Sequence, residues 1–220
     1  MIEPSKIFEV FQEKQALFTK SLNPGKKVYN ERLVIQDGVE YRQWDPTKSK
    51  LGAAILRGAS NVGIRKGDIV LYLGCSTGTT PSHVSDMIGE DGFLFGLDVA
   101  PRVLRNFVFL CEQRPNMTAL FEDAAHPEQY AAKVCEVDVV YQDVAQRNQA
   151  EIFLKNCKAF LKDGGYGLLA VKARSVDITK KPAVIFREVR EQIGKELIIV
   201  DERTLEPFEK DHCFFVCRKK

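Results

Sequence analysis

The sequence lacks a segment that could cross a membrane. No run of apolar residues approaches the roughly 18 that a membrane-spanning helix needs. Residues 1–10 mix Glu3, Lys6 and Glu9 with apolar residues, so they lack the basic region and the long apolar stretch of a signal peptide. We therefore expect an intracellular protein without a membrane segment.

The sequence also lacks the cysteine spacing of a metal site. Its six cysteines form no C-x-x-C pair and no zinc-ligand spacing with the three histidines. Isolated cysteines of an intracellular protein are usually reduced and pack as small buried apolar side chains. We expect reduced and mostly buried cysteines, with no metal and no disulfide, at Cys75, Cys111, Cys135, Cys157, Cys213 and Cys217.

An excess of one charge is absent too. Thirty-two Lys and Arg nearly balance thirty Asp and Glu, so a nucleic-acid-binding surface, if there is one, must be local. We find no internal repeat, no low-complexity tract and no Gly/Arg-rich tail. With 45% apolar and 28% charged residues, the composition is that of an ordinary globular protein. A chain of 220 residues can form one α/β domain with a small appendage.

The N-terminal part predicts a small antiparallel β domain, residues 1–48. Turn sequences at 23–25 (Asn-Pro-Gly) and 37–38 (Asp-Gly) separate short apolar segments. The expected strands are 7–11, 16–20, 32–36 and 39–42.

From residue 49 the pattern changes to alternating strands and helices. Short apolar runs of the buried-strand type occur at 69–73, 93–99, 137–142 and 167–171. Helices are expected at 50–56, 82–88, 101–113, 146–161 and 181–193. This alternation indicates a mostly parallel sheet covered by helices on both faces. Two final strands, 197–204 and 213–217, have no long helix between them, so we expect an antiparallel hairpin at one edge. The second domain is therefore α/β, residues 49–220.

A glycine turn follows the first apolar strand of this domain. Gly74 and Gly78 lie where the backbone must bend and approach a ligand, as a nucleoside cofactor requires. The segment is not a clean G-x-G-x-x-G, and it lacks the lysine of a phosphate loop. The alternative is a structural turn in which Thr79 and Thr80 cap the next helix.

Two carboxylates follow later strands. Asp98 ends a strand about 20 residues downstream, where it can accept hydrogen bonds from both ribose hydroxyls of an adenosine. Asp123 follows a short apolar segment and can accept from an adenine amino group; the alternative is a helix N-cap or a solvated loop carboxylate. Together these features predict a ligand at the carboxyl edge of the sheet. A redox dinucleotide fits less well, because its fingerprint is imperfect.

Four further polar residues lie at element ends on the same edge. Lys50 begins a helix, Asp143 and Lys172 end strands, and His212 begins the last strand. Taken singly, each has an ordinary explanation as a surface lysine or an incidental histidine or aspartate.

Several segments together resemble the fibrillarin family. They are 41–55, 72–80 with 82–86, 122–124, 143–146 and 205–212. The resemblance implies a class I (Rossmann-like) S-adenosylmethionine-dependent methyltransferase fold with a seven-stranded sheet, and a Lys-Asp-Lys-His set at Lys50, Asp143, Lys172 and His212. The implied cofactor is S-adenosyl-L-methionine. The residues expected to bind it are Gly74, Gly78, Thr79, Thr80, Asp98, Val99, Asp123, Ala124, Asp143 and Gln146.

The same resemblance implies methylation of ribose 2′-hydroxyls in rRNA, with tRNA as a further possibility. The implied partners are a C/D-box guide RNA and its target RNA, a Nop-family scaffold protein and a kink-turn-binding ribosomal-type protein. Without a Gly/Arg-rich extension the chain resembles the compact archaeal form, for which we expect a cytoplasmic location. Two departures are Asp98, where many fibrillarins carry Glu, and Cys75, where a smaller residue is common.

Methyl transfer to a 2′-hydroxyl needs alignment of oxygen, methyl and sulfur, and removal of a proton. Lys172, if desolvated beside Lys50, is a candidate base oriented by Asp143. Lys50 is equally suited to stabilise the developing alkoxide, and His212 to arrange the ribose or a phosphate. The sequence does not divide these roles.

Local cations are candidates for RNA contacts, although most such residues are simply solvated. They are Lys48, Lys50, Arg65, Lys66, Arg102, Arg105, Arg174, Lys180 and Lys181. The rival functions are a small-molecule methyltransferase, a non-catalytic subunit of an RNA particle, and a nicotinamide-dependent oxidoreductase.

Overall fold

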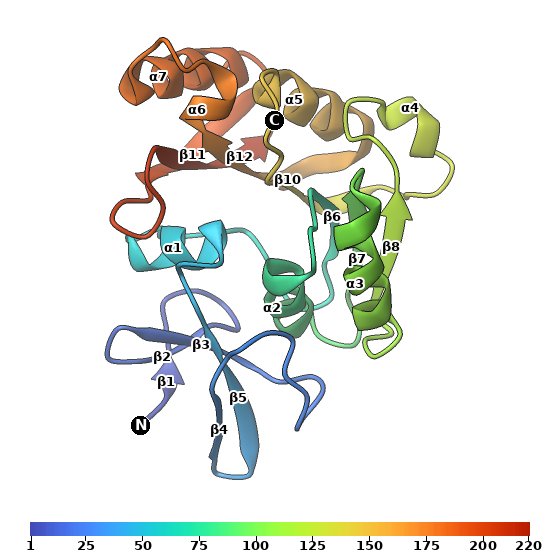
Figure 1. The fold of residues 1–220 in the computed structure, drawn as a ribbon, viewed down its shortest axis with the longest axis vertical. Helices are drawn as coiled ribbons and strands as arrows, with labels where there is room; N and C mark the ends of the chain where they lie inside the picture. The colour runs from blue at the N-terminus through green and yellow to red at the C-terminus, as the bar shows by residue number, and fades with distance from the viewer.

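Two β-sheets organise the chain (Figure 1). The computed structural model describes residues 1–220. The N-terminal sheet is antiparallel, with strand order β1-β2-β3-β5-β4. Its strands are β1 (Glu3–Pro4), β2 (Phe11–Glu13), β3 (Ala16–Lys20), β4 (Leu33–Gln36) and β5 (Val39–Trp44). This confirms the small antiparallel unit.

One expected strand of this unit is wrong. In the predicted strand 7–11 only Phe11 is extended, because residues 7–10 form a turn in which the Val10 amide donates to the Ile7 carbonyl (3.1 Å). Ile7 and Val10 are buried in the core shared with the second sheet. These apolar residues therefore enter the shared core from a turn rather than alternating along a strand.

The second sheet has the order β11-β12-β10-β9-β6-β7-β8. All its strands run parallel except β12, which is antiparallel to both β10 and β11. The strands are β6 (Ile69–Leu73), β7 (Phe93–Asp98), β8 (Met117–Phe121), β9 (Val137–Gln142), β10 (Leu161–Lys172), β11 (Leu197–Thr204) and β12 (His212–Lys219). The predicted seven-stranded sheet with a C-terminal antiparallel hairpin is confirmed.

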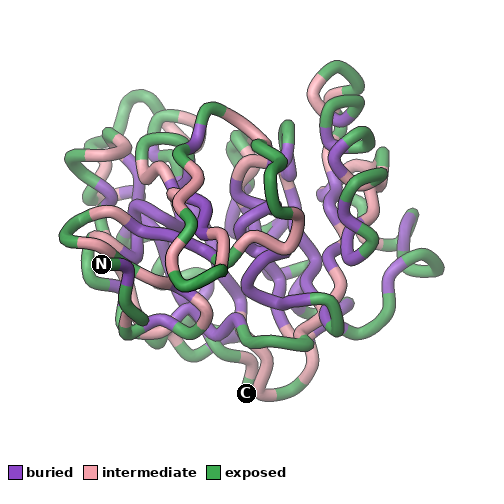
Figure 2. Tube along the Cα trace, turned by 90° about the horizontal axis from the view of Figure 1, so that it is seen from below, coloured by how far each residue is buried: buried purple, intermediate pink, exposed green.

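Helices cover both faces of this sheet. They are α1 (Lys50–Leu56), α2 (Thr79–Ile88), α3 (Pro101–Cys111), α4 (Pro127–Tyr130), α5 (Gln149–Phe160), α6 (Ala173–Val176) and α7 (Pro182–Ile193). Helices α1 to α3 share one core with the N-terminal sheet, and α4, α5 and α7 share the other. In Figure 2 the buried parts of the chain lie in the interior and the exposed parts lie mostly at the outside. No helix is both long and apolar enough to traverse a bilayer.

Some boundaries differ from those expected. Helix α2 begins at Thr79 instead of residue 82, because Pro81 lies in its first turn, where the missing amide proton is not needed. Strand β10 begins at Leu161 instead of residue 167, with an irregular register before Tyr166. The short helices α4 and α6 had no counterpart in the sequence analysis. Of the six cysteines, four are buried, Cys111 is half-buried and Cys135 is exposed.

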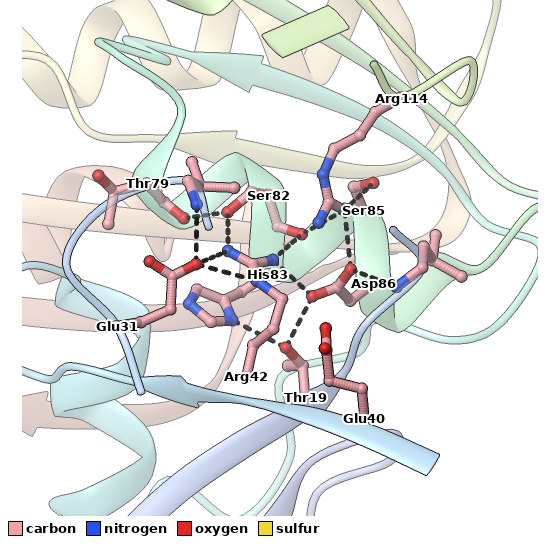
Figure 3. Close-up of polar contacts among 12 residues, drawn as sticks. Thr19, Glu31, Glu40, Arg42, Thr79, Ser82, His83, Ser85, Asp86 and Arg114 are labelled. Carbon is pink, nitrogen blue, oxygen red and sulfur yellow. Dashed lines mark hydrogen bonds and ion pairs between the residues drawn. The ribbon is translucent and has the colours of Figure 1, made fainter. Parts of the chain in front are cut away.

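A buried polar network joins the two sheets (Figure 3). Arg42 of β5 donates from Nη2 to Glu31 (2.9 Å) and from Nη1 to Asp86 of α2 (2.7 Å). Arg114, after α3, donates to the other Asp86 oxygen (2.7 Å). The side chains of Arg42, Glu31 and Asp86 are 0% exposed. Two guanidinium groups and two carboxylates thus neutralise one another inside the junction.

His83 of α2 lies beside this network. Its ring stacks on Trp44 with 4.7 Å between centroids, and Nδ1 and Nε2 lie 2.8 Å from the hydroxyls of Thr19 and Tyr29. Burial, and then Arg42 and Arg114, lower the pKa of His83 well below its ordinary value. The neutral ring therefore connects α2, the helix that follows the glycine turn, to the N-terminal part of the chain.

Candidate active site

A pocket opens at the carboxyl edge of the seven-stranded sheet. The ends of β6, β7 and β9 and the loop after β8 form it. Its walls contain seven predicted cofactor-binding residues, namely Gly74, Asp98, Val99, Asp123, Ala124, Asp143 and Gln146, together with Leu97, Val144 and Ala145. The predicted convergence of strand ends therefore forms a pocket in the structure.

The glycine turn is fixed by close backbone packing. Gly74 has a φ of +83°, and a Cβ there would lie 2.3 Å from the Asp143 carbonyl oxygen. Gly78 has a φ of +95°, and a Cβ there would lie 2.5 Å from a methyl carbon of Leu110. Both positions thus require glycine. The close packing at Gly74 also brings the end of β6 against the end of β9.

The predicted residues after this turn do not line the pocket. Gly78 is the N-cap of α2, and no side chain caps the helix, so the alternative in which Thr79 and Thr80 cap it is wrong. Thr80 is buried and donates to the Ser49 hydroxyl (3.0 Å), next to the start of α1. The start of α2 therefore supports the glycine turn without lining the pocket; its residues are Gly78, Thr79 and Thr80.

Asp98 ties the turn to the next strand. One carboxylate oxygen accepts from the Ser76 amide and the other from the Ala100 amide, both at 2.9 Å. A carboxylate has about four acceptor positions, so Asp98 retains capacity for two hydroxyl donors.

Asp123 also stabilises a loop. Its Oδ1 accepts from the Ala125 amide (2.9 Å), while the N-cap of α4 is His126, so Asp123 caps no helix. Its carboxylate lines the pocket beside Ala124.

Lys50 and Asp143 form an ion pair at the rim. Helix α1 begins at Lys50 because the Ser49 side chain caps it, accepting from the Gly52 amide (3.2 Å). Lys50 Nζ lies 3.3 Å from Asp143 Oδ2, and the two side chains are 24% and 28% exposed. Burial alone would lower the pKa of Lys50, but Asp143 and then Glu209 outweigh it and raise this pKa. Lys50 therefore stays protonated.

Burial also raises the pKa of Asp143, while the nearby Lys50 opposes the shift. The carboxylate is thus held in its charged form mainly by its lysine partner, and each group depends on the other.

Lys172 and His212 form a second pair, directly opposite each other on β10 and β12. Lys172 is exposed, so the desolvation that was set as the condition for its role as a base is absent from this structure. Asp143 makes its ion pair with Lys50 and shows no contact that would orient Lys172. His212 is buried, and its Nδ1 lies 2.7 Å from the Lys210 carbonyl. A carbonyl only accepts, so Nδ1 carries the proton and a neutral ring has its lone pair on Nε2.

Comparison with known proteins decides the family. The Fibrillarin family model matches residues 3–220. This chain belongs to the fibrillarin family. The fibrillarin-like rRNA/tRNA 2′-O-methyltransferase of Thermococcus gammatolerans is 50% identical over 205 residues, which are 93% of this chain and 91% of that protein.

Solved fibrillarin structures confirm the fold. Aeropyrum pernix fibrillarin, crystallised with natively bound S-adenosyl-L-methionine, is 39% identical with a TM-score of 0.91, covering 99% of this chain and 97% of that one. The fibrillarin/Nop5p complex contains a chain that is 35% identical with a TM-score of 0.89, covering 97% and 99%. The predicted family and class I methyltransferase fold are both confirmed.

Two buried glutamines of this fibrillarin were missed by the sequence analysis. The Gln149 side chain accepts from the Lys172 amide (3.2 Å) and donates to the Lys172 carbonyl (3.4 Å). Pairing of β9 with β10 ends at Leu169, so the Gln149 amide takes the place of a neighbouring strand. Gln142 donates to the Gln149 carbonyl (2.7 Å). The available signal in the sequence was Gln142, a polar residue at the end of an apolar strand.

The cations proposed for RNA contacts divide into two groups. Lys50 is paired as described, Arg174 pairs with Asp211 (2.6 Å) and Lys180 with Glu188 (2.7 Å). The others form no ion pair, although Lys48, Arg65 and Arg105 each lie over an aromatic ring; they are Lys48, Arg65, Lys66, Arg102, Arg105 and Lys181. Arg102 and Arg105 are exposed on α3, which begins two residues after the pocket residue Val99.

Proposed function

We propose that this protein transfers the methyl group of S-adenosyl-L-methionine to ribose 2′-hydroxyls of rRNA, with tRNA as a second substrate. The observation that carries the proposal is the meeting of the Lys50–Asp143 ion pair and the Lys172–His212 pair with a nucleoside-type pocket at one sheet edge. Family membership supports the same activity.

The residues of the pocket fit an adenosyl group. Asp98 has free acceptor positions for the two ribose hydroxyls, Asp123 offers an acceptor for an amino group, and Val99, 48% exposed, offers an apolar surface for a base. The bound sulfonium would supply an electrophilic methyl group. Gly74, Ala124 and Gln146 complete the walls, and Gly78, Thr79 and Thr80 support the turn.

The rim residues would handle charge and proton. Lys50 is held in its cationic form by two carboxylates, so it suits stabilisation of negative charge on the attacking oxygen. Lys172 lies on the same rim and makes no ion pair, so its amine is free to approach the ribose hydroxyl; we assign it the role of general base once bound RNA removes it from solvent. Asp143 holds Lys50 in place, and His212, through Nε2, would arrange the ribose or a neighbouring phosphate.

Target choice would lie with partners. We propose a C/D-box guide RNA, a Nop-family scaffold protein and a kink-turn-binding ribosomal-type protein. The fibrillarin/Nop5p complex supports the scaffold, and the unpaired cations, Arg102 and Arg105 among them, support contacts with guide and target RNA. A cytoplasmic location is part of the same proposal.

The test combines labelled S-adenosylmethionine with target RNA, with and without guide RNA and scaffold protein. We expect label on ribose 2′-oxygens only in the complete mixture. Label on a base would contradict the acceptor, and turnover on a small acceptor alone would favour a small-molecule methyltransferase. Tight NAD binding without S-adenosylmethionine binding would favour an oxidoreductase.

Variants test the residues within the same mixture. Lys172→Ala and Asp143→Ala should abolish transfer while circular dichroism shows an intact fold. Turnover retained by both variants would contradict the assignment, and a wild type that binds the cofactor but transfers nothing would indicate a non-catalytic subunit.

A further inference from the structure

Glu209 lies between the two pairs of rim residues. Its Oε1 is 3.7 Å from Lys50 Nζ, and its Oε2 is 3.9 Å from His212 Nδ1. The rim contains two pairs on different elements, Lys50 with Asp143 and Lys172 with His212. Glu209 faces a member of each pair with a different carboxylate oxygen.

The loop that carries Glu209 is held firmly. Leu205 is fully buried and its amide donates to the His212 carbonyl (3.0 Å), which closes the loop between β11 and β12. The Glu209 amide in turn donates to the Leu205 carbonyl (3.1 Å), and Phe208 packs against the core. The backbone at Glu209 is therefore held by the fold independently of the side-chain contacts with Lys50 and His212.

We propose that Glu209 is a positioning residue for methyl transfer, joining the Lys50–Asp143 pair to the Lys172–His212 pair. The proposal rests on the function proposed above and extends it to a residue outside the Lys-Asp-Lys-His set. One carboxylate oxygen fixes the ammonium of Lys50, and the other favours the ring orientation in which His212 Nδ1 points to the protein and Nε2 to the site. Both effects act through charge at 3.7 to 3.9 Å.

The central variant is Glu209→Gln, which keeps the shape and removes the charge. We expect kcat for RNA methylation in the complete particle to fall about tenfold, with S-adenosylmethionine affinity unchanged. Glu209→Asp keeps the charge at a shorter reach, so its kcat should lie closer to that of the wild type. The matched control is Glu206→Gln, an exposed glutamate of the same loop, which should stay within twofold of the wild type.

Double-mutant cycles show whether Glu209 acts through the rim. In single-turnover assays, Glu209→Gln should have less than half its logarithmic effect when Lys50→Met or His212→Gln is already present. Full additivity with both variants, or a Glu209→Gln rate within twofold of the wild type, would overturn the proposal.

A second measurement needs no RNA. Because Glu209 contributes to the raised pKa of Lys50, Glu209→Gln should lower this pKa, as followed by ¹³C NMR of the lysine Cε in the full chain. The carboxylate that still faces Lys50 in the variant is Asp143. An unchanged Lys50 titration would overturn the electrostatic link. If the wild-type particle transferred no methyl to ribose, the proposed function would fail while this titration still tested Glu209.

Discussion

The junction between the sheets and the rim of the pocket both pair basic residues with carboxylates, but they do so in opposite ways. At the junction, Arg42 and Asp86 are 2.7 Å apart and 0% exposed. At the rim, Lys50 and Asp143 are 3.3 Å apart and 24% and 28% exposed. Fully buried charges are tolerated only when nearly every donor and acceptor is used. Rim charges keep solvent access and unused capacity, which a substrate can take up.

The two regions are also physically connected. Helix α2 follows the glycine turn and carries both His83 and Asp86 into the junction. The network thus holds rigid the helix that follows the glycine turn, while the rim stays open. Variants at matched positions in the two regions can break or sharpen this contrast.

The largest expected effect is on stability at the junction. Arg42→Met leaves the Glu31 carboxylate and the Oδ2 atom of Asp86 without a cation in a buried environment. We therefore expect the free energy of unfolding to fall by about 3–5 kcal/mol. Lys50→Met at the half-exposed rim should change it by less than about 1 kcal/mol. Urea denaturation of both variants measures the difference. Equal losses would show that the two regions do not differ as described.

The next effect is on activity at the rim. Asp143→Asn removes the partner of Lys50, and we expect kcat to fall by about a hundredfold or more. The folded-state pKa of Asp143 is raised, so ionising it opposes folding as the pH rises above the unfolded value of about 3.9. At pH 7 the variant should therefore be at least as stable as the wild type. Single-turnover methylation measures the loss of activity, and urea denaturation measures the stability. A marked loss of stability in Asp143→Asn would contradict the prediction for folding.

The contrast also explains what the sequence could reveal. The carboxyl-edge positions of Asp98, Asp123 and Asp143 were predictable because parallel strands end at the same edge of a sheet. Their partners were not, since a position on an element does not specify which side chain it meets. Asp143 accordingly pairs with Lys50 on α1 instead of orienting Lys172.

Errors in the fold have the same origin. The apolar residues Ile7 and Val10 predicted a strand, yet they lie in a turn and are buried in the core that the two sheets share. Arg42 and Asp86 look like surface charges in the sequence, because only tertiary structure brings opposite charges 44 residues apart into contact. Local pattern therefore predicted most of the longer elements and most of the pocket residues, and it missed the polar interactions between the two sheets.

A smaller effect is expected for the glutamine that holds Lys172. Gln149→Leu leaves the Lys172 amide and carbonyl without their partner, so we expect kcat to fall about tenfold and stability by about 1–3 kcal/mol. The matched control is Asn116→Leu, which removes a buried amide bonded to Ser85 and Gly89 at the opposite edge of the sheet. It should lose similar stability and keep its kcat. If both variants lost activity to the same extent, Gln149 would contribute to the stability of the fold and not to the position of Lys172.

The smallest effect is the pH dependence of the junction. The pKa of His83 is lowered in the folded state, so below the unfolded value of about 6.5 the unfolded chain binds a proton that the folded chain does not. The contribution of His83 to the free energy of unfolding is thus fully present above pH 6.5 and is lost as the pH falls. Its slope is at most about 1.4 kcal/mol per pH unit. His83→Gln should flatten the urea-derived stability curve between pH 6.5 and 5. Since His83 lies in the closed network and not at the rim, the variant should leave the pH profile of methyl transfer unchanged wherever it stays folded. A shifted profile would show that the junction transmits charge, and not only rigidity, to the pocket.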